Sequence, residues 1–182
     1  MAEQGTPTAT ATALPEGTPV ELPWLEEPRF ACFGCSPRNR IGLALKMFRL
    51  DDGRLATDIT FSDEYASYPS VVHGGIVSVL VDELMGDLIA LDLGMLAFSV
   101  TLRTKFLRPL QVGVPYRAVA RITREANGVV HAEADVLDAD GTPHVMASSA
   151  YQPISSEQAE GHMGLAGADR DRLAHYFDHA IG

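Results

Sequence analysis

Hydrophobic and polar residues alternate along six stretches of the chain, and this period of two predicts six β-strands. The first two strands, residues 41–50 and 54–61, flank the turn sequence DDG and are predicted to form a hairpin. Four further strands follow later in the chain, separated by turns rich in Pro, Gly and Asn. They span residues 97–107, 116–125, 129–138 and 144–154. Consecutive strands at hairpin spacing favour an antiparallel sheet.

One long apolar helix is predicted between the second and third strands, from His73 to a C-terminal end between Asp92 and Gly94. Apolar residues lie on nearly every face of this helix, so it must be buried nearly all round. A curved sheet wrapped about one helix provides that burial. The sequence therefore predicts an α+β hotdog fold, with an antiparallel sheet of about six strands around one long central helix.

A chain of 182 residues is long enough for one domain with a substantial core, and we expect one domain with two tails. Residues 1–25 are rich in Thr, Ala, Pro and Gly and bury little apolar surface, which predicts a disordered N-terminal tail. Residues 26–153 are predicted to form the folded domain. Residues 154–182 are predicted to be a C-terminal extension with a short helix within residues 168–182.

The charge of the chain excludes some partners. It contains 14 Lys and Arg against 24 Asp and Glu, and the resulting net charge of −10 repels phosphate backbones and anionic membranes. No apolar run of about 18 residues predicts a transmembrane helix, and no basic region followed by an apolar one predicts a secretory signal. We expect a cytoplasmic protein that binds neither nucleic acid nor membrane.

Two cysteines, Cys32 and Cys35, lie in the sequence CFGC, which is typical of half a zinc site or of a redox pair. A structural zinc site needs four ligands, and no second Cys pair or well-spaced His pair lies nearby. His175 and His179 are spaced i,i+4, but they also lack a third ligand. We interpret the cysteines as reduced thiols in a loop, and predict neither a metal nor a cofactor.

Two adjacent carboxylates, Asp82 and Glu83, interrupt the apolar helix. A charged group in an apolar setting is costly unless it is paired, so such a residue usually has a function. Asp82 is the preferred catalytic candidate because Ser78 lies four residues before it on the same stripe. Glu83 points about 100° away and is expected at a polar edge. Two alternatives remain, namely Asp82 as a buried acid that stabilises a dimer and Glu83 as the true base.

The first turn of the helix contains two glycines, Gly74 and Gly75. Without side chains, they allow a substrate carbonyl to approach unpaired backbone N–H groups, where the positive end of the helix dipole stabilises an oxyanion. Gly75 is the preferred donor.

The sequence HGG at residues 73–75, with an aspartate nine residues after the histidine, resembles the hotdog-fold acyl-CoA thioesterases. This superfamily includes the phenylacetyl-CoA and hydroxybenzoyl-CoA thioesterases. Residues 32–48 resemble the Cys-rich lead-in and first strand of these proteins, and residues 101–113 resemble their third strand and its turn. The resemblance spans roughly residues 30–153.

The resemblance implies hydrolysis of an acyl-CoA, or of an acyl-carrier-protein thioester, without a metal. It makes Gly75 the oxyanion donor and Asp82 the general base or nucleophile, with the aspartate contributed by the other subunit of a dimer. Helix geometry agrees, because Gly75 and Asp82 are about 10 Å apart along one helix. We therefore expect a homodimer, or a dimer of dimers. His73 is predicted to be a supporting residue that orients the loop or touches the substrate carbonyl.

The third predicted strand carries polar residues at alternate positions, which places Ser99, Thr101, Arg103 and Lys105 on one face. Ser99 occupies a position where the family often has a Ser or Thr that holds the attacking water; a half-exposed polar face is the alternative. Arg103, Lys105 and Arg108 form a cationic cluster that suits the phosphates of CoA, although solubility of a strand edge explains it equally well. The predicted substrate-binding residues are Gly74, Ser78, Thr101, Arg103, Lys105 and Arg108.

One position departs from the family pattern. Some members have an Asn about six residues before the histidine, where this chain has Ser67. This departure leaves open the detailed mechanism and the substrate of any one subfamily.

Two other functions stay open, an acyl-thioester hydratase or dehydratase on the same fold and a non-catalytic acyl-CoA binding or sensor protein. The HGG sequence argues against the first, and a Thr- and Ala-rich N-terminus without a DNA-binding segment argues against the second.

Overall fold

The computed structural model describes residues 16–163 and residue 171. Its main sheet has seven strands, and every neighbouring pair is antiparallel. In spatial order the strands are β1 (Gly17–Val20), β2 (Met47–Leu50), β3 (Leu55–Thr60), β7 (Pro115–Ala126), β8 (Val129–Leu137), β9 (Pro143–Pro153) and β6 (Ala97–Phe106). The smaller elements are β4 (Ala66–Tyr68), β5 (Val71–Val72), α2 (Ser156–Met163) and the 3-10 turns η1 (Pro23–Glu26) and η2 (Asp63–Tyr65).

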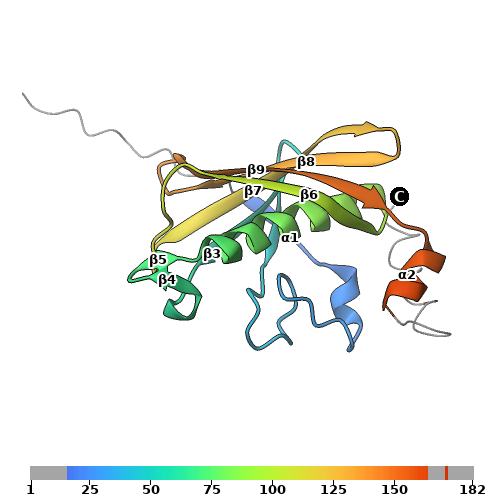
Figure 1. The fold of residues 1–182 in the computed structure, drawn as a ribbon, viewed down its shortest axis with the longest axis horizontal. Helices are drawn as coiled ribbons and strands as arrows, with labels where there is room; N and C mark the ends of the chain where they lie inside the picture. Colours follow the sequence, from blue (N-terminus) through green and yellow to red (C-terminus); the bar gives the residue numbers. More distant parts are fainter. Residues whose placement is uncertain (1–15, 164–170, 172–182) are drawn as a thin grey trace, which may run out of the picture.

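The long helix α1 (Gly74–Leu93) lies across one face of the main sheet (Figure 1). Leu80, Leu84 and Met85 are fully buried against the sheet. The helix ends at Gly94, whose left-handed backbone (φ 61°) allows its N–H to bond to the carbonyl of Ala90. This arrangement confirms the predicted antiparallel hotdog fold around one long helix.

The sheet is larger than the predicted one of about six strands. All six predicted strands are present, and β1 adds a seventh by pairing with β2. The prediction that residues 1–25 are disordered is therefore wrong for residues 16–25, because Leu22 and Trp24 are buried in the core and hold this segment in place. Residues 1–15 lie outside the described part of the chain.

Two more differences concern the ends of elements. The first predicted strand begins only at Met47 because the preceding residues form a loop, in which Ala44 has a positive φ of 47°. Helix α2 lies in the C-terminal extension but earlier than the helix predicted within residues 168–182, which falls outside the described residues apart from Asp171. Among the described helices, none is long and apolar enough to cross a membrane.

Strand β6 forms one edge of the sheet and pairs only with β9 among the described strands. Its register shifts between Ser99 and Thr101, where a β-bulge inserts an extra residue. An inserted residue reverses the faces of the side chains that follow it. Several large apolar side chains of this edge strand are exposed: Phe98, Val100, Leu102 and Phe106.

Candidate active site

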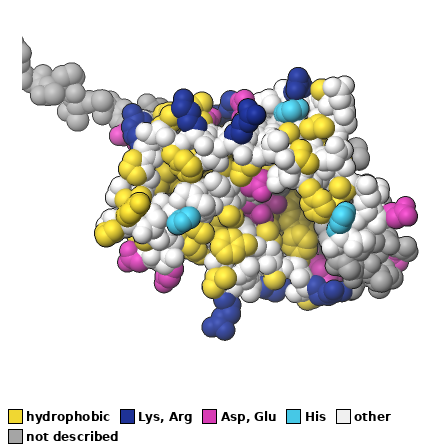
Figure 2. Space-filling model, in the orientation of Figure 1, with side chains coloured by type: hydrophobic (Ala, Val, Ile, Leu, Met, Phe, Trp, Pro, Cys, Tyr) yellow, Lys and Arg dark blue, Asp and Glu magenta, His cyan; other side chains and the backbone are white. Residues whose placement is uncertain are grey.

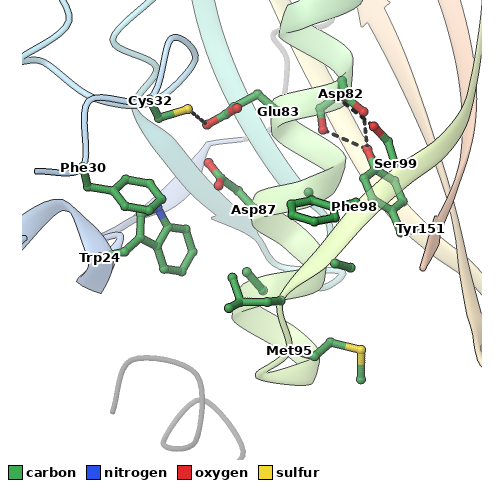
Figure 3. Close-up of a pocket in the computed structure, with 14 residues that line it drawn as sticks. Trp24, Phe30, Cys32, Asp82, Glu83, Asp87, Met95, Phe98, Ser99 and Tyr151 are labelled. Atoms are coloured by element: carbon green, nitrogen blue, oxygen red, sulfur yellow. Dashed lines mark hydrogen bonds between the residues drawn. The ribbon is translucent and has the colours of Figure 1, made fainter. Parts of the chain in front are cut away.

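A cavity of about 310 Å³ lies beside the middle of α1. In Figure 2, acidic side chains gather in a hollow between hydrophobic ones on this face of the molecule. Three carboxyl groups from α1 line the cavity, those of Asp82, Glu83 and Asp87. The rest of the lining is mostly apolar or small and comprises Trp24, Phe30, Cys32, Gly86, Ala90, Met95, Leu96, Ala97, Phe98, Ser99 and Tyr151 (Figure 3).

Asp82 is half-buried and is held by two neighbouring strands. The hydroxyl of Tyr151 on β9 lies 2.9 Å from Oδ1 of Asp82 and 2.9 Å from its backbone carbonyl oxygen. The hydroxyl of Ser99 on β6 lies 3.4 Å from Oδ2 (Figure 3). Ser99 and Tyr151 are register partners across β6 and β9, so the sheet presents both hydroxyls to the same carboxylate. The carboxylate therefore has a defined orientation at the cavity wall.

Tyr151 was not among the predicted site residues. Its side chain is only 2% exposed, and its burial, together with the nearby charge of Asp82, raises the pKa of the Tyr151 phenol. The hydroxyl therefore stays protonated and donates. A buried tyrosine needs a hydrogen-bond partner for its hydroxyl, so a tyrosine in a predicted strand is the signal in the sequence for such a contact. The identity of the partner depends on strand register, which the alternation of residues does not reveal.

Glu83 points away from Asp82, as the helix geometry predicts, but it does not face a polar edge. The loop containing CFGC folds back onto α1 and covers it. The Sγ of Cys32 and the Oε1 of Glu83 lie 2.9 Å apart in a hydrogen bond. Burial, followed by the proximity of Cys32, raises the pKa of Glu83 to about 8. The expectation of a polar edge is wrong because Cys32, 51 positions earlier in the chain, packs there.

The two cysteines are free thiols, as predicted. Hydrogen bonding from Cys35 is the main cause that lowers the pKa of Cys32 to about 5, and a backbone N–H from Gly34 at 3.3 Å assists. Asp87 lies one turn after Glu83 and is 7% exposed. Its burial, and then the charge of Glu83, raise the pKa of Asp87. Its Oδ2 atom is buried and has no hydrogen-bond partner among the described residues.

The N-terminus of α1 lies away from this cavity. His73 is the N-cap residue, and its Nδ1 accepts a hydrogen bond of 2.9 Å from the N–H of Gly75. The predicted oxyanion donor is thus engaged within its own chain. The N–H of Gly74 has no hydrogen bond among the described residues. A Cβ on Gly74 would lie 3.2 Å from the ring of Phe106, so the close packing of β6 favours glycine there.

Gly74 lines a second hollow, of about 370 Å³, at this end of the helix. Arg108 lines the same hollow, and its Nη1 donates to the carbonyl of Pro143 at 2.9 Å. Ser67 lines it as well, and its hydroxyl lies 3.4 Å from the carbonyl of Val71 in the hairpin of β4 and β5. The other residues in its lining are Tyr68, Val71, Val72, Val77, Phe106, Leu107, Pro109 and Leu110.

The predicted common face of Ser99, Thr101, Arg103 and Lys105 is wrong because of the β-bulge. Ser99 faces α1, but after the bulge it is Thr104 that reaches the helix, with its Oγ1 3.3 Å from the hydroxyl of Ser78. Thr101 and Arg103 instead line a hollow on the other face of the sheet, together with His131, Glu133 and Ser148. Lys105 is adjacent to Thr104 in the strand, so its side chain points to the opposite face, together with those of Thr101 and Arg103.

Ser78 has no contact with the cavity of Asp82. Its hydroxyl donates to the carbonyl of Gly74 at 3.0 Å, one turn earlier, and also contacts Thr104. Among the predicted site residues, the structure therefore brings Ser99 to Asp82, and it brings Arg108 to the hollow of Gly74. Thr101 and Arg103 line a third hollow, apart from Asp82 and Ser99 and apart from Gly74 and Arg108.

Comparison with known proteins agrees with this architecture. Residues 70–143 match the family model of the thioesterase superfamily. An inferred esterase of Saccharolobus solfataricus is 32% identical over 101 residues, which cover 54% of this chain and 71% of that protein. The chain belongs to the thioesterase superfamily.

Solved structures resemble this superfamily member in fold. The thioesterase superfamily protein RHA08564 superposes with a TM-score of 0.60 at 23% identity, over 64% of this chain and 60% of that one. The Streptococcus mutans protein smu.793, solved with acetyl-CoA bound, superposes with a TM-score of 0.56 at 16% identity, over 61% of this chain and 89% of that one. The chain thus spans less than two thirds of the length of RHA08564.

Replacement of Tyr151 tests how this superfamily member orients its aspartate. Tyr151→Phe keeps the ring but removes the donor to Asp82, so we expect the free energy of unfolding to fall by about 1–3 kcal/mol. Tyr68→Phe is the matched control, because Tyr68 is 74% exposed, and it should change stability by less than about 0.5 kcal/mol. Urea denaturation at one fixed protein concentration measures both. Equal stabilities for the two variants would contradict the buried hydrogen bond.

Proposed function

We propose that the protein hydrolyses an acyl-CoA, or an acyl-carrier-protein thioester, to a free acid and a thiol, with Asp82 as the catalytic group. The observation that carries this proposal is the half-buried Asp82 carboxylate, oriented by Tyr151 and adjacent to Ser99 at the wall of a mainly apolar cavity. A carboxylate that is oriented and partly desolvated is suited to general-base or nucleophilic catalysis.

The two oxygens of Asp82 have different surroundings. Oδ1 accepts a hydrogen bond of 2.9 Å from Tyr151, whereas Oδ2 has only the longer contact of 3.4 Å with Ser99. Oδ2 is therefore the oxygen that takes a proton from water, with Ser99 holding that water. The water oxygen bonds to the thioester carbon, and the carbonyl electrons move to its oxygen. When this intermediate collapses, the C–S bond breaks and the thiolate takes the proton from Asp82.

Direct attack by Asp82 is the second route through the same carboxylate. Oδ2 would then bond to the thioester carbon and expel the thiolate, and water would hydrolyse the resulting mixed anhydride. Both routes develop negative charge on the thioester oxygen. Both therefore need a hydrogen-bond donor opposite Asp82.

The N–H groups of Gly74 and Gly75 at the positive end of α1 are the proposed donors. Gly74 has no competing partner among the described residues. Gly75 already donates to Nδ1 of His73, so a substrate carbonyl would compete with this ring for the N–H. His73 thereby acts as a supporting residue that orders the first turn of the helix before substrate binds.

Asp82 lies in the middle of α1, whereas these donors lie at its N-terminus. Seven residues separate Gly75 from Asp82, a rise of about 10 Å, and the two groups line different hollows. One thioester cannot contact both within a chain. We propose a homodimer, or a dimer of dimers, in which Asp82 of one protomer meets the glycines of its partner. The exposed apolar residues of edge strand β6 support self-association, because such an edge is a template for pairing.

The surroundings suggest how the substrate is divided between the two hollows. The aromatic and aliphatic side chains Trp24, Phe30, Met95 and Phe98 offer an apolar surface for the acyl group beside Asp82. Arg108 lies in the hollow of Gly74, where it suits a phosphate of CoA. The fold is shared with a protein solved with acetyl-CoA bound, which supports CoA as the carrier. Arg103 lies on the other face of the sheet and is a weaker candidate.

Substitution of Asp82 tests the catalytic assignment. Asp82→Asn keeps the shape of the side chain but can neither accept a proton nor attack, so kcat should fall by about 10²–10⁴. Asp92→Asn on the same helix is the matched control, since Asp92 pairs with Arg49 away from the cavity, and it should retain kcat. Thiol release from a panel of acyl-CoAs measures both.

Glu83→Gln in the same panel separates the adjacent acids, and it should lower kcat much less than Asp82→Asn does. If Asp82→Asn turns over like the wild type, or if Glu83→Gln is the more damaging change, the assignment is wrong. Inclusion of an enoyl-CoA tests the hydratase alternative, for which water addition without thiol release is the expected result.

Subunit mixing tests the shared site. Asp82→Asn and Gly75→Pro lie in opposite halves of the proposed site, and Pro is tolerated in the first turn of a helix, where it removes one N–H. Each variant alone should be inactive. After subunit exchange, half of the dimers are heterodimers, and each has one intact site and one doubly altered site, so activity should recover to about a quarter of wild type per total protein.

Circular dichroism and sedimentation must first show that both variants fold and associate. Labelled subunits then report whether exchange has occurred. A mixture that exchanges subunits and stays inactive contradicts the shared site, because a site confined to one chain carries one lesion in every copy.

A further inference from the structure

We propose that Cys32, Cys35 and Glu83 bind a divalent metal ion of the zinc type, with Asp87 as the fourth ligand. One ligand atom from each of the first three residues lies within 4.8 Å of the others. The cysteines come from the CFGC loop, and the two acids come from α1. The metal would join the loop to the helix beside Asp82.

The loop is shaped to bring its thiols onto the helix. A Cβ on Gly34 would lie only 2.3 Å from Cγ and Cδ of Glu83, so the absence of a side chain at residue 34 is what allows this contact. Backbone hydrogen bonds fix the loop on both sides of Gly34, from the N–H of Leu43 to Phe33 at 2.8 Å and from the N–H of Leu45 to Gly34 at 3.0 Å. The sulfur atoms are therefore positioned before any ligand arrives.

Asp87 provides a second, independent observation. It is 7% exposed, it lines the same cavity as Cys32 and Glu83, and its Oδ2 has no hydrogen-bond partner among the described residues. In Figure 3, Asp87 and Glu83 extend from α1 toward the same side as Cys32, away from Asp82 and Ser99. Because a buried carboxylate oxygen without a partner is costly, native structures usually pair it with a donor or a cation.

The charge of the cavity points to a cation rather than to another donor. Its described lining contains three carboxyl groups and no Lys, Arg or His. Zn²⁺ takes cysteine sulfur and carboxylate oxygen as ligands and is usually four-coordinate, so two cysteines and two acids could complete its tetrahedron, and the sulfur ligands disfavour Mg²⁺ and Ca²⁺. Bonds of about 2.3 Å to sulfur and about 2.1 Å to oxygen place neighbouring ligand atoms roughly 3.5–3.8 Å apart. Cys32 and Glu83, now 2.9 Å apart, would separate slightly as the metal replaces the proton between them.

The proposed metal has a positioning role. It would hold the wall of the cavity formed by Cys32 and Glu83, while Asp82 leaves the helix about 100° away and keeps its own partners, Tyr151 and Ser99. The site is therefore independent of the proposed hydrolysis. A protein that binds zinc without hydrolysing thioesters, or the reverse, would separate the two proposals.

The test uses the reduced, full-length protein. After treatment with a chelator and gel filtration, Zn²⁺ or Co²⁺ is added, and the bound metal is measured by elemental analysis. We expect about one metal per chain. Bound Co²⁺ should also give a near-ultraviolet sulfur-to-metal charge-transfer absorption, which reports thiolate ligands directly.

Four variants assign the ligands. Cys32→Ser with Cys35→Ser should abolish the charge-transfer absorption, and Asp87→Asn, which keeps the buried side-chain shape, should weaken binding at least about 10-fold. Gly34→Ala should also weaken binding, because its methyl group displaces Glu83. Asp138→Asn is the control, since this acid contacts His144 outside the cavity, and it should bind like the wild type.

Two results would overturn the proposal. One is a folded, reduced wild-type protein that takes up less than about 0.2 metal per chain from excess Zn²⁺ and shows no charge-transfer absorption with Co²⁺. The other is binding that stays unchanged in a folded Asp87→Asn protein and in the double cysteine variant.

Discussion

The main physical constraint on this fold is that its buried, apolar helix α1 carries carboxyl groups that are partly or fully removed from bulk water. Helix α1 packs against the sheet with Leu80, Leu84 and Met85 fully buried, and the same helix presents three carboxyl groups to one cavity. Each acid needs its own compensation, because an isolated charge in this setting is unfavourable. Asp82 obtains it from Tyr151, and Glu83 obtains it from Cys32. The segments that pack around α1 therefore provide partners for its acidic side chains as well as cover for its apolar surface.

This division of partners explains why two adjacent acids have different surroundings. Their side chains leave the helix about 100° apart, so Asp82 meets the sheet while Glu83 meets the CFGC loop. The sheet provides the hydroxyl groups of Tyr151 and Ser99, which orient the carboxylate of Asp82. The loop provides sulfur, and burial raises the pKa of Glu83 to about 8. The same turn of helix therefore carries the proposed catalytic acid on one side and a proposed metal ligand on the other.

Much of this could be predicted from local sequence. The run of apolar residues that follows HGG predicts the helix, and Gly94 predicts its C-terminal end. Both signals are local, because helical periodicity and capping depend on neighbouring residues. The bulge at Ser99 could not be predicted, because one inserted residue leaves alternation apparently intact while it reverses the faces of Thr101 and Arg103. Tyr151 and the contact of Glu83 with Cys32 were also missed, because both depend on packing between segments more than 50 residues apart.

In the proposed shared site, one thioester contacts Asp82 of one protomer and the N-terminus of α1 of its partner. A crystal structure of the Asp82→Asn protein with a non-hydrolysable acyl-CoA analogue, in which a methylene group precedes the sulfur, tests it most directly. The proposed mechanism predicts that the ligand's carbonyl carbon lies about 3–3.5 Å from the side chain of residue 82, or from a water held by that side chain and Ser99, in one protomer. It also predicts that the carbonyl oxygen accepts a hydrogen bond from the N–H of residue 74 or 75 in the other protomer. Both contacts coming from one chain, or a carbonyl remote from residue 82, would contradict it.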